Sequence, residues 1–293
     1  MQAVAILIDV VGPIFLIALV GFIWARRGSA FDTRFVSMLV TNVGTPCLVI
    51  DNLTHANLAL GALGQIALGS VLCHAIALAA GYAFVRALRE PITVYLPALA
   101  FPNSGNMGLP MALFAFGEVG LALAIAFYAT ASLIQFTVGQ SIAAGGMSPG
   151  ALLRLPLVWA ILAALALAVI GVKLPAIADR AVHIMAGLMV PLMILSLGYS
   201  LASLKTGSLR RATVFAVARL IGGFAIGLLV AWMLGLEGAA RGVVVVQSAM
   251  PSAVFNYMFA ERYGNRPEEV AGVVVVSTFL SVATLPVFLS FLI

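Results

Sequence analysis

The stretch Ala100-Phe-Pro-Asn-Ser-Gly-Asn-Met-Gly-Leu-Pro110 interrupts a long apolar segment that runs from residue 92 to residue 116. Between Pro102 and Pro110 it places two prolines and two glycines within nine residues, with polar side chains among them. Proline removes a backbone hydrogen bond from a helix and clashes with the preceding turn, and glycine weakens the helix further. The stretch therefore predicts a helix that is broken and unwound from Pro102 to Pro110.

The composition places this broken helix in a membrane. Hydrophobic residues make up 63% of the 293 residues, charged residues only 9%, and the mean hydropathy is +1.17. A soluble domain needs far more charge on its surface, whereas about 20 apolar residues per span leave room for about ten transmembrane helices. We expect an all-α membrane protein with spans at residues 4–24, 35–53, 60–85, 92–116, 119–143, 152–172, 181–201, 212–234, 239–263 and 269–291.

A second expected span carries a comparable break, Ala249-Met-Pro-Ser-Ala-Val-Phe-Asn256. Unwound backbone at membrane depth is tolerated only where it lines a cavity or packs inside protein. Two discontinuous helices at corresponding positions of two halves are the best sequence indication of a transport site. The two breaks therefore favour a secondary transporter.

The chain divides into two similar halves. A joint rich in Gly, Ser and Pro at residues 145–151 separates residues 1–144 from residues 152–293, and each half holds five expected spans. An odd number of spans makes the second half start on the opposite side of the membrane. The second and fourth spans of each half contain an internal proline. This pattern predicts two inverted five-helix repeats, a common plan in secondary transporters.

Lysine and arginine are unevenly divided between the expected loops. Eleven lie on one side of the membrane and three on the other, with Arg219 inside a span. Because cytoplasmic loops carry the excess, we expect a multi-pass protein of the plasma (cell inner) membrane with both termini outside the cytoplasm. The same bias accounts for the net charge of +5, and no basic run interleaved with aromatic residues suggests a nucleic-acid partner.

Motifs of enzymes and cofactor sites do not stand out. The sequence has no HExxH motif, no Walker A loop and no dinucleotide fingerprint. Cys47 and Cys73 lie apart in apolar stretches and indicate neither a metal site nor a disulfide framework. We therefore expect no enzyme, no cofactor and no metal. His74, deep in an apolar span, is the candidate for proton handling, so coupling to H⁺ or to Na⁺ stays open.

The segment from Pro102 to Pro110 resembles the fourth span of the auxin efflux carrier family. Residues 249–264, with Pro267 and the closing Thr284-Leu-Pro286, are similar to that family's ninth and tenth spans. The plant members carry a long cytoplasmic loop between the halves. The short joint of this chain resembles the bacterial members instead, which makes auxin a poor candidate for the natural substrate.

The resemblance implies the inverted-repeat fold of the bile acid/auxin carrier superfamily, shared with bile acid sodium symporters. Helices 1, 2, 6 and 7 would form a scaffold, and helices 3–5 and 8–10 a transport domain that moves like an elevator. Helices 4 and 9 would cross near Pro102 and Pro251. The family's substrates are mostly organic anions such as malate, malonate or indole acetate. A homodimer built on the scaffold is also implied.

The resemblance assigns Asn103 a contact with the substrate carboxylate, and an amide can donate two hydrogen bonds without a fixed charge. Ser252 matches Asn103 when the prolines of the two breaks are aligned, and Tyr128 resembles part of the family's binding wall. These polar residues could instead cap half-helices or bond neighbouring helices. The expected substrate-binding residues are Asn103, Ser104, Asn106, Tyr128, Gln247, Ser252 and Asn256, and the expected residues of the crossing are Pro102, Gly105, Pro110 and Pro251.

Three functions remain open from the sequence. The favoured one is a secondary carrier of a small organic anion, a carboxylate such as malate or malonate, that works by alternating access. The second is a sodium-coupled symporter of a larger amphipathic acid on the same fold. The third is a membrane enzyme or a sensor without transport. A catalytic set is missing at membrane depth and no signalling domain is evident, so the third is the least favoured.

Overall fold

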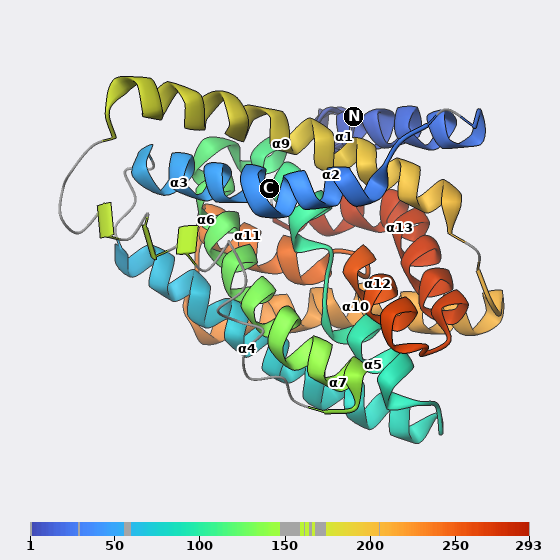
Figure 1. Ribbon diagram of the computed structural model, residues 1–293. Coiled ribbons are helices and arrows are strands. Elements are labelled where there is room, and N and C mark those ends of the chain that lie inside the picture. Colours follow the sequence, from blue (N-terminus) through green and yellow to red (C-terminus); the bar gives the residue numbers. More distant parts are fainter. Residues whose placement is uncertain are drawn as a thin grey trace.

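Helices make up nearly all of the described chain (Figure 1). The computed structural model describes residues 2–28, 30–55, 60–146, 174–204 and 206–292, with the pairs 159–160, 162–163 and 166–167. The first half contains α1 (Gln2–Arg26), α2 (Thr33–Leu39), α3 (Thr45–His55), α4 (Leu60–Ala87), α5 (Ile92–Ala100), α6 (Leu109–Ile134) and α7 (Gln140–Ala144). The second half contains α9 (Ala176–Ser203), α10 (Leu209–Met233), α11 (Gly238–Ala249), α12 (Val254–Tyr263) and α13 (Pro267–Leu289). Three π-helical turns connect the helices of the first half, namely η1 (Val40–Gly44), η2 (Ser104–Gly108) and η3 (Gln135–Gly139).

Five helical segments of the described residues are long and apolar enough to cross a membrane, namely Gly61–Ala87, Ser104–Ala144, Ala176–Ala202, Leu209–Met233 and Pro267–Leu289. The chain is therefore an α-helical membrane protein, as its composition predicts. The expected span at residues 152–172 lies largely outside the described residues, as do residues 147–151 of the joint. The count of about ten spans stays a prediction.

One of these segments is bent at a glycine. Gly117 has φ 65° and ψ −160°, so the helix that begins at Ser104 is interrupted inside α6. A residue with a side chain is strained at such a positive φ, whereas glycine adopts it at little cost. The interruption falls at the boundary expected between residues 116 and 119, and it separates the predicted fourth and fifth spans.

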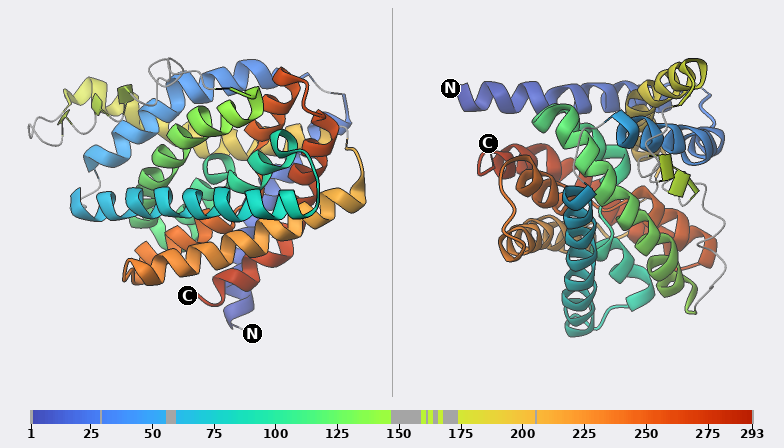
Figure 2. Two further views of the ribbon diagram at one scale, coloured as in Figure 1. Left: turned by 90° about the horizontal axis from the view of Figure 1, so that it is seen from below. Right: turned by 90° about the vertical axis from the view of Figure 1, so that its left-hand side faces the viewer.

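The helices form two layers, which can be followed in two views (Figures 1 and 2). In the smaller layer α1 lies along α9, and α3 packs against α9 from the other side. The larger layer contains α4 to α7 and α10 to α13. The helices that lead to the N- and C-termini end on the same side of the molecule (Figure 2).

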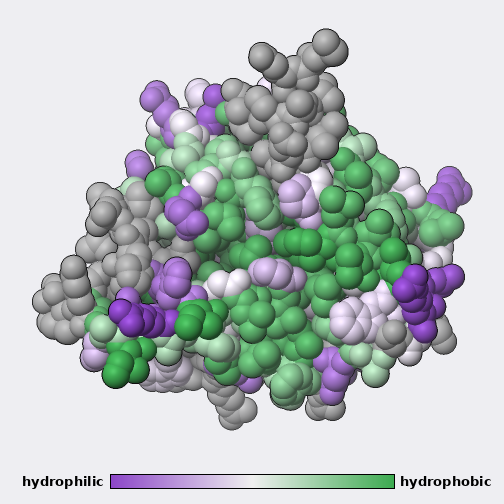
Figure 3. Space-filling model, turned by 90° about the horizontal axis from the view of Figure 1, so that it is seen from above, coloured by the Kyte–Doolittle hydropathy of each residue, from purple (hydrophilic) through white to green (hydrophobic). Residues whose placement is uncertain are grey.

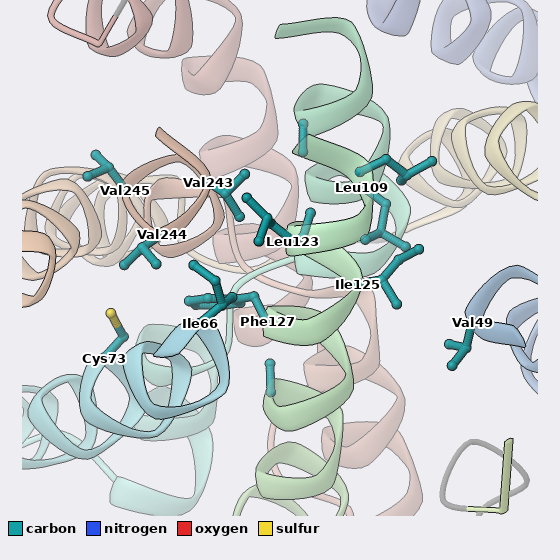
Figure 4. Packing of buried hydrophobic residues seen from close by; sticks show 14 of the residues in the cluster. Val49, Ile66, Cys73, Leu109, Leu123, Ile125, Phe127, Val243, Val244 and Val245 are labelled. Carbon is teal, nitrogen blue, oxygen red and sulfur yellow. The ribbon is translucent and has the colours of Figure 1, made fainter. Parts of the chain in front are cut away.

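Apolar side chains fill the core of the larger layer (Figure 4). Leu123 and Phe127 of α6 pack with Ile66 of α4 and with Val243 and Val244 of α11. The same cluster continues into the smaller layer, where its members are Leu48, Val49, Ala186, Met189 and Met193. The two layers therefore meet over an apolar surface that holds no ion pair among the described residues.

Many large apolar side chains lie on the outside of the molecule. Ile177, Trp232 and Leu16 are 87%, 78% and 65% exposed. Figure 3 shows hydrophobic residues across the middle of one face, with hydrophilic residues toward its margins. An apolar surface of this extent suits contact with lipid, because monomeric soluble proteins rarely expose contiguous apolar patches of more than a few hundred Å².

Candidate functional site

The two predicted breaks meet in the middle of the larger layer. Helix α5 ends at Ala100 and α11 ends at Ala249. The amide nitrogen of Asn103 donates to the carbonyl oxygen of Pro251 across 2.7 Å, and the amide nitrogen of Ala253 donates to Phe101 across 3.1 Å. These two bonds form a short antiparallel bridge. The broken helices leave these backbone groups without intrahelical partners, and the bridge supplies the missing hydrogen bonds. Backbone groups inside a membrane need such partners because no water is available there.

The register of this bridge differs from the alignment of the prolines. Pro102 lies opposite Ser252, so the local two-fold relation of the paired backbones matches Asn103 with Ala253. Aligning the prolines would match Asn103 with Ser252. The pairing is therefore shifted by one residue relative to that alignment.

The unwound stretch is shorter than the sequence predicts. Only residues 101–103 lack helical structure between α5 and η2, and Ser104 to Gly108 form a π-helical turn that leads into α6. Pro110 lies in the first turn of α6. The helix nevertheless continues through this proline, because the N–H of Leu109, directly before it, donates to the carbonyl of Gly105 and residues Ser104–Ala144 form one helical segment.

Asn256 and Ser252 hold the two chains of the crossing together. The side-chain nitrogen of Asn256 donates to the carbonyl of Phe101 and to the hydroxyl of Ser252, both at 3.0 Å. Its side-chain oxygen accepts from Gln135 at 3.1 Å. The amide of Ser252 donates to the hydroxyl of Ser277 at 3.1 Å. Both side chains are buried and occupied with partners, which suits a structural role at the crossing.

Asn103 and Gln247 differ from these residues because their buried amides lack partners. Asn103 is 4% exposed and its side-chain nitrogen forms no hydrogen bond. Gln247 is fully buried, and neither its oxygen nor its nitrogen has a partner. The Gln247 amide lies against Gly108, where an added Cβ would overlap it. Buried polar groups are nearly always satisfied, so these two amides beside one turn are candidates to bind a water or a ligand.

The π-helical turn η2 lies between Gln247 and Tyr128. The ring of Tyr128 packs so closely on Gly105 that a Cβ there would lie 2.8 Å from Cε2 of the ring. Ser104 is buried within η2, and Asn106 is half-buried. The structure thus brings Asn103, Ser104, Tyr128 and Gln247 to one short turn. Ser252 and Asn256 lie at the crossing but are bound to protein groups.

His74 and Arg219 occupy another part of the crossing. The ring of His74 in α4 stacks on Phe101 with 5.7 Å between centroids, and its Nδ1 lies 2.7 Å from the carbonyl of Ser70. Arg219 of α10 is 3% exposed and donates to the carbonyls of Leu99 and Ser248. The sequence marked Arg219 only as a charge within a span. Its contacts with two half-helix ends could not be read from spacing along the chain.

Comparisons with known proteins identify the class of the protein. The family described as "Membrane transport protein" matches residues 143–289, which is half of the chain. The chain belongs to this membrane transport protein family, that of the auxin efflux carriers. The family resemblance read from the sequence is thereby confirmed, and the protein is a multi-pass membrane transporter.

A relative extends the match across both halves. An uncharacterized transporter of Methanothermobacter thermautotrophicus (strain ATCC 29096 / DSM 1053 / JCM 10044 / NBRC 100330 / Delta H) is 28% identical over 293 residues, which cover 95% of this chain and 96% of that protein. The family match includes α11 and α12, which carry the second chain of the crossing. The break at Pro102 lies outside the family match, in the first half of the chain. The relative spans both halves, since the alignment covers 95% of this chain.

Proposed function

We propose that this membrane transporter carries a small organic anion, a carboxylate such as malate or malonate, through the crossing of α5/η2 with α11/α12. The observation that carries the proposal is the pair of buried amides, Asn103 and Gln247, that lack partners beside η2. A carboxylate accepts hydrogen bonds only, so amide N–H groups are suitable partners for it. Ser104, Asn106 and Tyr128 would complete the site around the same turn.

The helix that begins at Ser104 adds to the attraction for an anion. The N–H of Ser104 donates to the carbonyl of Pro102, and the N-terminal end of the helix carries partial positive charge, as at other anion sites at helix N-termini. Helix α12 begins just after the crossing at Val254 and presents a second such end. A site made of dipoles and amides binds a carboxylate without a fixed countercharge. That property suits a carrier, which must also release its substrate.

The substrate would reach the site through movement of one layer against the other. We propose that the smaller layer, with the span expected at residues 152–172, is the scaffold and that the larger layer is the transport domain. Asn103 and Gln247 are buried in this conformation, so a solute reaches them only after a rearrangement. The apolar surface between the layers supports sliding, because no described ion pair has to break. The ten-span inverted repeat and the extracytoplasmic termini belong to this proposal.

A homodimer on the scaffold is part of the same proposal. Helix α9 exposes apolar side chains along its outer face, among them Ile177 at 87% and Ile184 at 71%. A second copy would cover such a face better than lipid alone if the two surfaces fit. Native mass spectrometry in mild detergent should show dimers, and a purely monomeric protein would contradict this part.

Uptake by purified protein in proteoliposomes tests the function. A panel of labelled mono- and dicarboxylates, with imposed proton or sodium gradients, should give saturable uptake of a small carboxylate. Uptake of bulky amphipathic acids driven by a sodium gradient would favour the symporter. Binding without uptake of any member would favour a sensor. The gradient arms also test the candidate role of His74 in proton coupling, with His74→Gln as the variant.

A further inference from the structure

Arg219 connects the ends of two half-helices that lie far apart in the sequence. Its guanidinium donates to the carbonyl of Leu99, one residue before the end of α5, and to the carbonyl of Ser248, one residue before the end of α11. The last carbonyls of a helix have no intrahelical partner and carry partial negative charge. A single buried cation therefore satisfies the carboxyl-terminal ends of both half-helices.

Within the described part of the chain, the charge of Arg219 is balanced by helix ends and not by an acidic side chain. No carboxylate among the described residues forms an ion pair with Arg219. Each helix end is equivalent to roughly half a negative elementary charge, so two converging ends balance about one cation. Burying an unbalanced charge costs several kcal/mol, and the pairing of one guanidinium with two helix ends offsets part of that cost.

A small cavity of about 10 Å³ joins Arg219 to His74, and its other lining residues include Cys73, Pro102 and Ser248. Nε of Arg219 and Nε2 of His74 are both buried without partners. The carbonyl of Ser70 can only accept, so Nδ1 of His74 carries the proton and Nε2 offers a lone pair. The cavity has room for one water, which would accept from Arg219 and donate to His74.

We propose that Arg219 is the resident cation of the crossing, a positioning residue that holds α5 and α11 together and shares one water with His74. Gly223 makes room for it, because a Cβ there would meet both the guanidinium and the carbonyl of Ser248.

The inference rests on the proposed function in one respect. With this cation in place, no dissolved cation has to enter between the two helix ends, so anion uptake proceeds when Na⁺ is replaced by N-methyl-D-glucamine.

Thermal unfolding of Arg219→Ala with added small molecules tests the assignment. The variant loses two hydrogen bonds from a charged group, so its melting temperature should fall on the order of 10 °C. A cavity of about 210 Å³ borders Arg219 and gives a small molecule access. Methylguanidinium, well below denaturing concentrations, should restore more than half of the loss in Arg219→Ala and leave the wild type unchanged. N-methylurea, which is planar but neutral, should restore none.

Each outcome decides the proposal. Equal rescue by N-methylurea would show that donors suffice without charge, and an unchanged melting temperature in Arg219→Ala would remove the role altogether; either result overturns it. If Arg219→Ala does not fold, Arg219→Lys must melt above Arg219→Gln, because only lysine keeps the charge, and the reverse order overturns the proposal.

Wild-type uptake that requires Na⁺ would overturn the predicted cation independence. Absence of any anion uptake would refute the proposed function while the melting data still test Arg219.

Discussion

The backbone amide of Asn103 is bonded to the carbonyl of Pro251 across 2.7 Å, which joins the broken helix of the first half to that of the second. Ala253 and Phe101 form the reciprocal bond at 3.1 Å. Both bonds lie among buried residues, where exchange with water is not available. We therefore expect the four helical ends that meet here to behave as one unit, so that a change in one break affects the other.

Replacement of Asn256 should weaken this unit. Asn256→Ala removes hydrogen bonds to Phe101, Ser252 and Gln135 and leaves buried partners unsatisfied. We expect a loss of roughly 2–4 kcal/mol and a fall of about 5–10 °C in melting temperature, measured by differential scanning fluorimetry. Gln140→Ala is the control, since it removes one hydrogen bond to Tyr263 away from the crossing. A melting temperature equal to that of the control would mean that Asn256 does not support the crossing.

Gly105 is expected to be intolerant of a methyl group. In Gly105→Ala the new Cβ lies 2.8 Å from the ring of Tyr128, so η2 or the ring has to move at a cost of roughly 1–3 kcal/mol. Uptake should fall along with stability, because η2 carries Ser104 and Asn106. Gly64→Ala is the matched control, as its added Cβ meets no atom within 4 Å apart from its chain neighbours and the backbone of its own helix.

A second substitution checks the cause of that effect. Tyr128→Leu removes the ring edge that the new methyl group meets, so the double variant should melt above Gly105→Ala alone. Equal melting temperatures for the single and double variants would show that contact with Tyr128 is not responsible.

The sequence predicts the position of the breaks better than their form. Proline and glycine mark where helices are interrupted, so Pro102 and Pro251 lie in the crossing as expected. The same residues do not define the form of the backbone nearby. Ser104 to Gly108 stays wound as a π-turn, which passes into α6 at Leu109 without a break.

The partners of polar residues depend on contacts between distant segments. Asn103 and Asn256 look alike in the sequence as amides near a proline. Asn256 finds three partners in the fold, while the side-chain nitrogen of Asn103 finds none. Arg219 similarly meets Leu99, 120 residues away. Such pairings follow from how the helices pack, which a single sequence does not specify.

Cross-linking the two layers should stop transport. Phe22 of α1 and Phe279 of α13 face each other with 6.5 Å between ring centroids. In a background of Cys47→Ala and Cys73→Ala, cysteines at both positions joined by a bifunctional reagent should abolish uptake, and cleaving the linker should restore it. The physical reason is that the scaffold and the transport domain can no longer slide past each other.

A pair within the smaller layer provides the control for that experiment. Phe31 and Tyr199 stack at 4.8 Å, close to α1 and α9 of the same layer. Cysteines there should cross-link without loss of uptake. Full transport by the cross-linked Phe22–Phe279 variant would show that these layers do not move relative to each other.

The arrangement of charged loops predicts that both termini lie outside the cytoplasm. The spans expected from the sequence would put eleven lysines and arginines on one side of the membrane and three on the other. Fusions of alkaline phosphatase, which is active only outside the cytoplasm, should be active at either end of the chain. An inactive phosphatase together with a fluorescent cytoplasmic reporter at either terminus would overturn the topology.

Binding of a carboxylate to Asn103→Ala tests the central claim most directly. Wild-type protein in proteoliposomes should show saturable uptake of a member of the carboxylate panel. Asn103→Ala should lose a charge-assisted hydrogen bond of roughly 1.5–3 kcal/mol, about ten- to a hundredfold in affinity, while its melting temperature changes little because the amide nitrogen has no protein partner. Unchanged affinity in folded Asn103→Ala and in folded Gln247→Ala would show that the substrate binds elsewhere.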